Sequence, residues 1–415
     1  MADQPTVTLA DIEAARVRTR GLVRTTPLWP SRVLSELAGI SVSLKCENLQ
    51  HTGSFKVRGA VNMLRSIERP GGVIAASAGN HAQAVAMAAS GLDLPSTVVV
   101  PADAPLAKQR ATEGYGAELI RVDGPLSLAI EHAQELATER GLVFIPPFDD
   151  PSIVAGQGTV ALELLEQAPD VEAVLVPAGG GGLLAGIATA VKAMRPDVTV
   201  IGVQTAAMPG IAVSRVAGEA RSVEAARTIA DGVAVAGPSA LTHSLIERFV
   251  DEVVTVSEEQ IAQAVLFLLE RARLVIEGAG ALGVAALLSG AVVPEGPTVA
   301  VLSGGNIDIN LIGRIVERGL LIEGRRRRMT VAAANVPGEL ARITGGAAEV
   351  GANIIEVEHE LVTADLPAGV ARITLHLEVA DDDAYERLID HLIARGLVPG
   401  DHTDLMTAAA ASMPS

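Results

Sequence analysis

Lys56 is the first residue of this chain whose type and position suggest chemistry. It lies in the segment HTGSFKVRGA (51–60), at the expected start of a helix. The positive end of a helix dipole lowers the pKa of an ammonium group, which favours the neutral amine that a Schiff base requires. A lysine in a first helical turn is more often a solvated surface residue. Lys56 is therefore a candidate catalytic residue only if other segments support it.

A turn rich in hydrogen-bond donors follows the apolar stretch GGVIAA, at SAGNH (77–81). Ser77, Gly79, Asn80 and His81 stand where a strand is expected to end and a helix to begin. Such a turn can bind a carboxylate through its N–H groups and side chains. An ordinary helix cap is the alternative interpretation of the same residues.

Four consecutive glycines, Gly179, Gly180, Gly181 and Gly182, separate the expected strand VEAVLVPA from the helix that begins at Leu183. Without side chains, successive backbone N–H groups can point at one anion, which predicts a phosphate site. The segment lacks the Lys-Ser/Thr ending of a nucleotide P-loop, and this argues against ATP or GTP.

Ser303 follows the apolar strand PTVAVL and opens the turn SGGN (303–306). In open α/β sheets the carboxyl ends of the strands line the ligand crevice, so this serine is expected at the site. Ordinary turn chemistry is the alternative interpretation.

A further glycine segment, GAGALG (278–283), matches the dinucleotide-binding pattern G-x-G-x-x-G. The acidic residue expected about 20 positions later would be Glu295, which stands in the turn VVPEGP instead of on a second strand. Close helix packing therefore explains these glycines better than a dinucleotide site does.

The composition favours a small-molecule enzyme of the cytoplasm. The formal net charge of −17 repels nucleic-acid phosphates and anionic membrane surfaces, and the 2% of aromatic residues leaves no base-stacking platform. No apolar run approaches the roughly 20 uninterrupted residues that span a bilayer. One cysteine and a beginning without the order of a secretion signal point to the cytoplasm.

The elements expected to position these residues follow α/β order. From about residue 40 to 320, short apolar runs alternate with helical patterns, which indicates mostly parallel sheets covered on both faces. The run Arg325–Arg328 is interpreted as a solvated linker instead of an anion site. After it the order β-α-β-β-α is characteristic of a small α+β module. We expect a catalytic domain at 1–323, a second domain at 324–406 and a flexible tail at 407–415.

Taken in order, the four segments resemble the threonine dehydratase and serine racemase branch of the tryptophan-synthase-like, type II pyridoxal-phosphate enzymes. The resemblance covers residues 8 to 320 and includes TTPL (25–28) and KCENLQ (45–50). It implies a catalytic domain of two lobes with open parallel sheets, and pyridoxal 5′-phosphate as cofactor. The implied reaction removes water and ammonia from L-threonine, and also from L-serine.

The resemblance also implies roles for individual residues. Lys56 would hold the cofactor as a Schiff base and act as general base. Phe55 would lie against the cofactor ring, Asn80 would hydrogen-bond its 3′ oxygen, and the neutral Ser303 would meet its pyridine nitrogen, which favours prompt loss of the β-hydroxyl. Gly179–Leu183 would hold the cofactor phosphate, and Gly232 and Glu277 would have lesser roles on the cofactor side. The substrate carboxylate would bind at Ser77, Gly79, Asn80 and His81.

Two alternatives stay open: a serine racemase or other β-eliminase on the same scaffold, and a catalytically silent amino-acid sensor. The complete set from Lys56 to Ser303 disfavours the sensor. Gln204 stands where metal-dependent relatives carry a glutamate, and residues 206–208 offer no side-chain oxygen, so no metal is expected.

The C-terminal module resembles an ACT domain through NVPGEL (335–340) and VGANI (350–354). Pro337 and Gly338 fit a strand-to-helix turn, although a final strand is hard to see after Gly396. The resemblance implies an allosteric module with a branched-chain amino-acid effector, a place in isoleucine biosynthesis or in threonine catabolism, and a homodimer or homotetramer. Structural scaffolding is the alternative.

Overall fold

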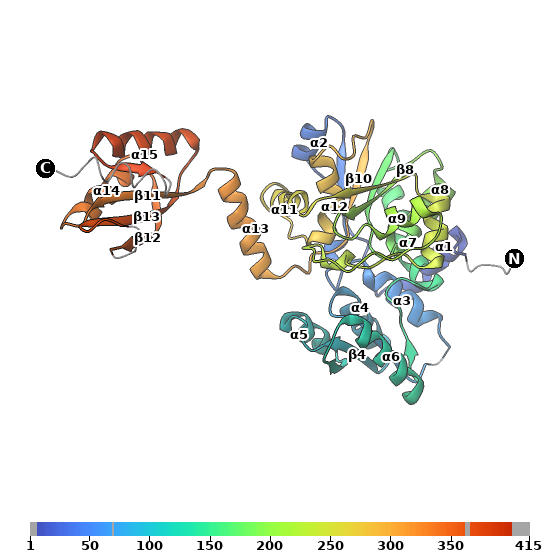
Figure 1. Ribbon diagram of the computed structural model, residues 1–415. Helices are drawn as coiled ribbons and strands as arrows, with labels where there is room; N and C mark the ends of the chain where they lie inside the picture. Colours follow the sequence, from blue (N-terminus) through green and yellow to red (C-terminus); the bar gives the residue numbers. More distant parts are fainter. Residues whose placement is uncertain (1–5, 69, 362–365, 401–415) are drawn as a thin grey trace. The chain divides into compact units, whose positions relative to one another are not determined.

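The computed structural model describes residues 6–68, 70–361 and 366–400 (Figure 1). Contacts divide the chain into two compact units, Met1–Asp308 and Ile309–Ser415. The helix that precedes the arginine run therefore belongs to the second unit. The tail expected at 407–415 lies outside the described residues.

A six-stranded sheet forms the large lobe of the first unit, in the order β1-β2-β10-β7-β8-β9. Its strands are β1 (Leu28–Pro30), β2 (Val42–Cys46), β7 (Ala173–Pro177), β8 (Thr199–Thr205), β9 (Glu252–Val256) and β10 (Thr298–Leu302). All neighbours are parallel except β1 and β2. Every residue of β7 and β10 is buried, because helices cover both faces of the central strands.

The helices of the large lobe are α1 (Leu9–Thr19), α2 (Arg32–Ala38), α7 (Pro151–Gln167), α8 (Gly182–Met194), α9 (Gly210–Ala217), α10 (Ala240–Phe249), α11 (Glu258–Phe267) and α12 (Gly278–Leu288). The glycines of α12 explain the dinucleotide-like pattern. A Cβ on Gly283 would lie 3.3 Å from Leu175 Cβ, and one on Gly280 would lie 2.5 Å from the carbonyl oxygen of Gly304. The pattern serves close packing against β7 and the loop after β10.

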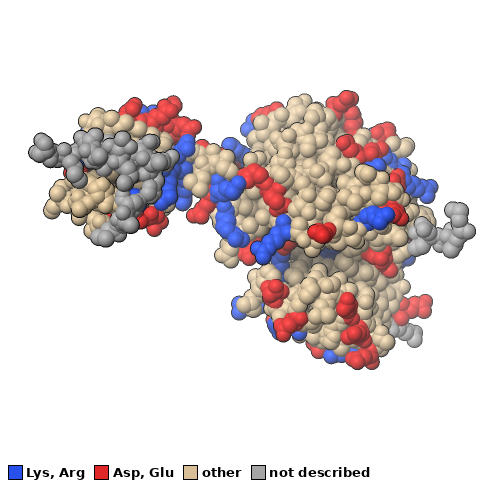
Figure 2. All heavy atoms as spheres, viewed as in Figure 1, with Lys and Arg blue, Asp and Glu red and all other residues tan. Residues whose placement is uncertain are grey.

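A smaller sheet forms the second lobe of this unit, in the order β5-β4-β3-β6 with all neighbours parallel. Its elements are β3 (Val73–Ala76), β4 (Ser96–Pro101), β5 (Glu118–Val122) and β6 (Val143–Phe144), with α3 (Lys56–Ser66), α4 (Asn80–Ser90), α5 (Leu106–Gly114) and α6 (Leu126–Arg140). The expected pair of open parallel sheets is confirmed. On the face shown in Figure 2, acidic side chains are prominent over this small lobe.

The second unit begins with α13 (Ile309–Ile322) and continues as an antiparallel sheet in the order β12-β13-β11-β14 with two helices. Its elements are β11 (Arg326–Ala334), α14 (Glu339–Glu349), β12 (Asn353–Glu360), β13 (Val370–Glu378), α15 (Asp382–Ala394) and β14 (Val398–Gly400). A core of its own includes Val331, Ile343, Leu375 and Leu388. The chain thus adds a sixth element, β14, to the expected β-α-β-β-α order.

The interpretation of the arginine run as a linker is wrong for most of its length. Arg326, Arg327 and Arg328 open strand β11, where their side chains reach carboxylates at Glu317, Asp382 and Glu358. Pairing with β13 fixes their backbone, and the ion pairs offset the repulsion between neighbouring arginines. Across the described ranges, no helix is long and apolar enough to cross a bilayer.

Candidate active site

A cavity of about 280 Å³ lies where strands β3, β7 and β10 end. This volume is close to the lower limit of about 300 Å³ for small-molecule sites. The structure brings every sequence-predicted site residue to its wall: Phe55, Lys56, Ser77, Gly79, Asn80, His81, Gly179, Gly180, Gly181, Gly182, Leu183, Gly232, Glu277 and Ser303. Segments that are far apart in sequence meet there because the carboxyl ends of parallel strands share one edge of a sheet.

Lys56 is the first residue of α3, as expected, and its amine reaches into the cavity. Nζ donates a hydrogen bond to the carbonyl oxygen of Pro147 at 3.0 Å and lies 5.3 Å from the centre of the Phe55 ring. Burial lowers the pKa of Lys56 to about 8, while the Glu277 carboxylate acts in the opposite direction. The helix dipole was expected to lower this pKa, whereas burial is the main cause.

The turn at 77–81 is an uncapped helix start. Helix α4 begins at Asn80, and its N-cap is Gly79, which has no side chain to accept from the N–H groups of the first turn. The Gly79 N–H donates to Ser77 Oγ at 3.1 Å. An ordinary side-chain cap is therefore wrong as an explanation of this segment, because no such cap hydrogen bond is formed. Uncapped first-turn N–H groups of this kind can bind an anion.

His81, the last residue of this turn, has a neutral side chain at neutral pH. Its side chain is buried, and Nε2 donates to the carbonyl oxygen of Ile145 at 2.8 Å. Burial is the main reason that the pKa of His81 falls to about 3, with a contribution from Lys56. At neutral pH this residue contributes a backbone N–H and an uncharged ring instead of a cation.

Asn80 is fixed by hydrogen bonds on both sides of its amide. Nδ2 donates to Glu277 Oε1 at 2.8 Å, and Oδ1 accepts from Asn306 Nδ2 at 2.8 Å. Glu277 Oε2 is buried without a partner among the described residues. Burial, together with the nearby Asp231 carboxylate, raises the pKa of Glu277 to about 7. Sequence reasoning missed Asn306, although it ends the SGGN segment.

The tetraglycine turn is shaped by its neighbours. A Cβ on Gly180 would lie 2.5 Å from the Phe148 ring, and one on Gly179 would lie 2.9 Å from Val233 Cα. Gly181 has φ of +92°, a left-handed conformation that favours glycine. Thr242 Oγ1 donates to the Gly180 carbonyl at 2.8 Å. The turn is a rigid backbone cradle at the start of α8, suited to an anion.

Ser303 is buried directly after β10. Its carbonyl oxygen accepts a hydrogen bond from the Phe55 N–H at 3.1 Å, and Ser54 forms an isolated bridge with Gly304. These backbone contacts tie the serine turn to the segment that carries Lys56.

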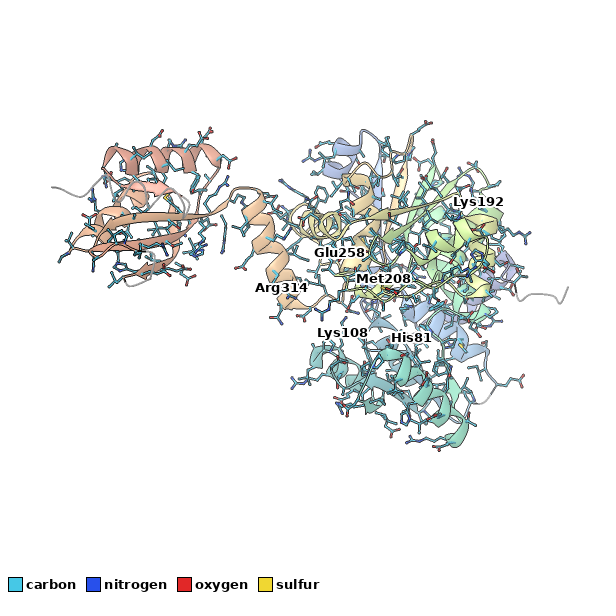
Figure 3. All side chains as sticks on the ribbon, viewed as in Figure 1. His81, Lys108, Lys192, Met208, Glu258 and Arg314 are labelled. Carbon is cyan, nitrogen blue, oxygen red and sulfur yellow. The ribbon has the colours of Figure 1, made fainter. Side chains whose placement is uncertain are left out.

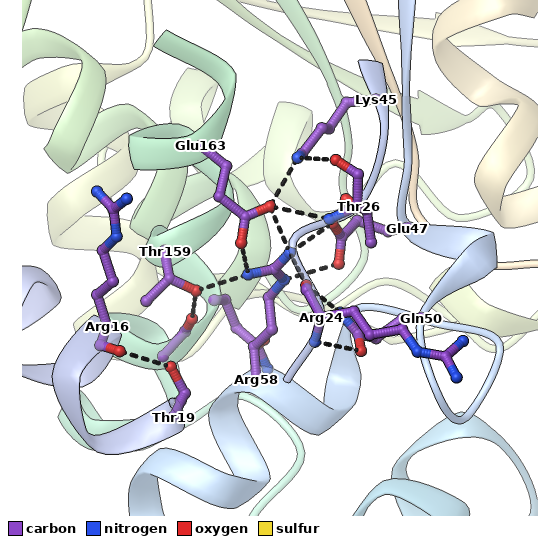
Figure 4. Close-up of polar contacts among 12 residues, drawn as sticks. Arg16, Thr19, Arg24, Thr26, Lys45, Glu47, Gln50, Arg58, Thr159 and Glu163 are labelled. Carbon is purple, nitrogen blue, oxygen red and sulfur yellow. Dashed lines mark hydrogen bonds and ion pairs between the residues drawn. The ribbon is translucent and has the colours of Figure 1, made fainter. Parts of the chain in front are cut away.

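A buried ionic network lies beneath the start of α3 (Figure 4). The Arg58 guanidinium donates to both carboxylate oxygens of Glu47 and of Glu163, at 2.7 to 2.9 Å. Lys45 Nζ donates to Glu163 Oε2 at 2.7 Å. Two cations and two carboxylates therefore balance, and they join β2, α3 and α7 two residues from Lys56.

Gln204 is occupied within the protein. Its Nε2 donates to the Ala178 carbonyl at 3.3 Å, and its Oε1 accepts from the Ala212 N–H at 2.9 Å. Within the described ranges, no group of three or more His, Cys, Asp or Glu residues could hold a metal ion.

Comparison with known proteins identifies the family. The profile of the pyridoxal-phosphate dependent enzymes matches residues 19–304. The chain belongs to this family. One relative, an L-threonine ammonia-lyase of Thermotoga maritima, is 47% identical to this chain. The alignment covers 94% of this chain and 98% of the relative. One from Geobacter sulfurreducens is 46% identical over 92% and 96%.

Solved structures agree with the fold of this family. The T.th. threonine deaminase has a TM-score of 0.71 and 43% identity, and it covers 73% of this chain and 99% of its own. Maize serine racemase has a TM-score of 0.72 and 31% identity, over 77% and 100%. The T. maritima similarity covers a larger share of the chain than these structures do and extends into the second unit.

The tetraglycine cradle offers a sharp test of cofactor binding in this pyridoxal-phosphate dependent enzyme. Gly180→Ala forces a Cβ against the Phe148 ring, and overpacking of this kind typically costs about 1–3 kcal/mol. We expect the affinity of the apoprotein for pyridoxal 5′-phosphate to fall by about 5- to 150-fold, measured by absorbance titration. The control is Gly345→Ala in α14, where a Cβ meets nothing within 4 Å. Equal affinities of the two variants would contradict a cradle at this turn.

Proposed function

We propose that the chain removes water and ammonia from L-threonine to give 2-oxobutanoate, with L-serine as a second substrate. One observation carries the proposal: the predicted lysine, carboxylate turn, glycine cradle and serine share one cavity wall. The high identity to two L-threonine ammonia-lyases over nearly the whole chain supports the choice of substrate.

The residues present fit pyridoxal 5′-phosphate. Gly179–Leu183 would hold the phosphate, Phe55 and Asn80 would contact the ring and its 3′ oxygen, and Ser303 would meet the ring nitrogen. The glycine cradle, which a Cβ would fill, and the buried Lys56 amine are the features that match this group. When bound, the cofactor supplies a ring that withdraws electrons from the substrate carbon next to the amine.

The protein residues then perform three tasks. The turn at 77–81 holds the α-carboxylate through its N–H groups. With the substrate amine bound in its place, Lys56 Nζ would be free to take the α-proton as general base. Lys56 Nζ can give this proton to the β-hydroxyl, which leaves as water. The released enamine tautomerises and takes up one water molecule, which gives 2-oxobutanoate and ammonia. Because Ser303 is neutral, it would not keep the ring nitrogen protonated as a carboxylate would, and this would favour prompt loss of the hydroxyl.

Product analysis tests this function. Purified holoenzyme is incubated with L-threonine, L-serine or D-serine, and oxoacid, ammonia and amino-acid chirality are measured. We expect 2-oxobutanoate and ammonia in equal amounts from L-threonine. Conversion of L-serine mainly to D-serine would favour the racemase that the similarity to maize serine racemase keeps as a second candidate. Absence of any reaction, with cofactor bound, would favour a silent sensor.

The pKa of Lys56 predicts how the apoprotein acquires its cofactor. Because the neutral amine forms the bond and the pKa is lowered to about 8, the rate of covalent attachment should rise roughly tenfold per pH unit below pH 8 and level off above it. Stopped-flow absorbance measures this rate, with Nα-acetyl-lysine as the free-amine control. A rate that keeps rising towards pH 10, as for the free amine, would contradict the lowered pKa.

The second unit is proposed to be an ACT-like regulatory domain. Its βαββαβ order, its separate core and the similarity to L-threonine ammonia-lyases that extends into it support this assignment.

We propose a branched-chain amino acid as effector. Isoleucine or valine should then change the threonine KM of the full chain, by coupling of about 1–3 kcal/mol or 5- to 150-fold. Three further points stay predictions: a homo-oligomeric state, a cytoplasmic location, and a place in isoleucine biosynthesis or in threonine catabolism.

A further inference from the structure

Lys108 and Asp231 form an ion pair across the cavity, and sequence reasoning singled out neither. Lys108 lies on α5 of the small lobe, and Asp231 lies in the 3-10 turn η2 (Asp231–Val233), which packs against α12 of the large lobe. Lys108 Nζ and Asp231 Oδ2 are 2.5 Å apart, and both residues line the cavity. Figure 3 labels Lys108 and His81 at the junction of the two lobes.

Lys108 stands beside the turn that is proposed to hold the substrate carboxylate. Its Nζ lies 3.9 Å from the position that a Cβ would take on Gly79, the N-cap of α4. A carboxylate at the first-turn N–H groups would therefore come within reach of this ammonium group. A carboxylate and an ammonium group at this distance attract each other electrostatically.

A cation beside the turn would strengthen the binding of an amino-acid carboxylate, because a charge-assisted hydrogen bond is stronger than a neutral one, and few groups of the cavity wall can supply this charge. Within the part of the chain that the structure describes, the wall contains two lysines, Lys56 and Lys108, and no arginine. Lys56 is committed to the cofactor and to the α-proton, and His81 is uncharged at neutral pH. Lys108 is the remaining positive charge for an α-carboxylate.

The present partner of Lys108 can be exchanged at low cost. The Asp231 side chain is 57% exposed, whereas that of Lys108 is only 16% exposed. An ion pair with one such solvated partner contributes little free energy, because water stabilises the free carboxylate almost as well. Lys108 can leave Asp231 for a substrate carboxylate, and Asp231 then returns to solvent.

We infer that Lys108 binds the α-carboxylate of the substrate beside the turn at 77–81, and that Asp231 competes with the substrate for it. The inference rests on the proposed function in three respects: the substrate is an α-amino acid, its carboxylate lies at the turn at 77–81, and Lys56 holds the cofactor. It differs from a simple latch between the lobes. A latch needs both partners, whereas competition makes the two residues act in opposite directions on substrate affinity.

Four variants of the holoenzyme test this inference, with the KM and kcat for L-threonine measured for each. Lys108→Met should raise the KM roughly tenfold or more with kcat much less affected, because a charge-assisted hydrogen bond to the substrate is lost. Lys108→Arg should restore most of the affinity. Asp231→Asn should lower the KM below that of the wild type.

The fourth variant, Lys192→Met, is the matched control. Lys192 pairs with Asp251 at 2.8 Å, with side-chain exposures of 17% and 41%, so its burial is close to that of Lys108. Figure 3 labels Lys192 on the large lobe, away from the junction. The KM of Lys192→Met for L-threonine should equal that of the wild type. A rise in KM of equal size in Lys108→Met and Asp231→Asn would show an interlobe latch and overturn the inference.

Titration with glycine separates this inference from the proposed function. Glycine has a carboxylate but no leaving group, so its binding can be followed by cofactor absorbance without turnover. If the wild-type holoenzyme does not deaminate L-threonine, but glycine binds more weakly to Lys108→Met than to the wild type, the proposed function fails and the inference stands. If threonine turns over with an unchanged KM in Lys108→Met and glycine binds as in the wild type, the inference fails and the function stands.

Discussion

Lys56→Ala should lower the kcat for L-threonine by at least about 10²–10⁴-fold, the contribution of a positioned general base. The loss should be larger than this range if the covalent bond to the cofactor also limits its retention. The physical reason is that Nζ of Lys56 reaches into the cavity on whose wall the four segments meet, and burial keeps it poised to be neutral. Steady-state assays of 2-oxobutanoate release measure the effect.

Lys192→Ala serves as the control for this substitution, because it removes a lysine of the same chain that does not line the cavity. Its kcat should stay near that of the wild type. Pyridoxal 5′-phosphate should still bind to Lys56→Ala through the glycine cradle, although without a covalent bond. A Lys56→Ala protein that retains a substantial part of the wild-type kcat would contradict the role of Lys56 as base.

Arg58→Met should cause the largest loss of stability, about 3–5 kcal/mol in the free energy of unfolding. The substitution leaves the carboxylates of Glu47 and Glu163, which are 0% and 9% exposed, without their main partner. Only Lys45 remains to neutralise two buried negative charges. Because Arg58 belongs to α3, we also expect weaker retention of the cofactor two residues away. Urea denaturation of the first unit, followed by circular dichroism, measures the change.

Arg16→Met is the matched control for the network. Arg16 pairs with Glu166, but both side chains are about half exposed, at 46% and 55%. Such surface pairs contribute roughly 0–1 kcal/mol, so the control should unfold almost as the wild type does. If Arg58→Met and Arg16→Met lose equal stability, the buried network does not hold α3 in place.

The sequence was sufficient for the parts of the site that depend on local chain geometry. Gly179–Gly182 and Ser303 each follow an apolar strand, and a parallel sheet brings such strand ends to one edge. The position of Lys56 at the start of α3 was also predicted correctly. The reason is again local, because the spacing of apolar residues indicates where that helix begins. Short segments with strong turn chemistry were therefore predictable.

Contacts between distant segments were not predictable in this way. Lys108 and Asp231 meet only because the two lobes face each other, and nothing in the sequence near either residue marks it. The partners of Arg58 come from the turn directly after β2 and from α7, about 100 residues later in the chain. Arg326–Arg328 were misinterpreted because charge suggests a linker, whereas antiparallel pairing with β13 decides their conformation.

Reduction of the holoenzyme with borohydride, followed by peptide mapping, tests the central claim most directly. The treatment makes the bond between cofactor and lysine permanent, so the modified residue can be identified by mass spectrometry. We expect the pyridoxyl group on the peptide that contains Lys56 and on no other. A pyridoxyl group on Lys108, the other lysine of the cavity wall, or on any further lysine would contradict the assignment of Lys56 as the cofactor-binding catalytic base.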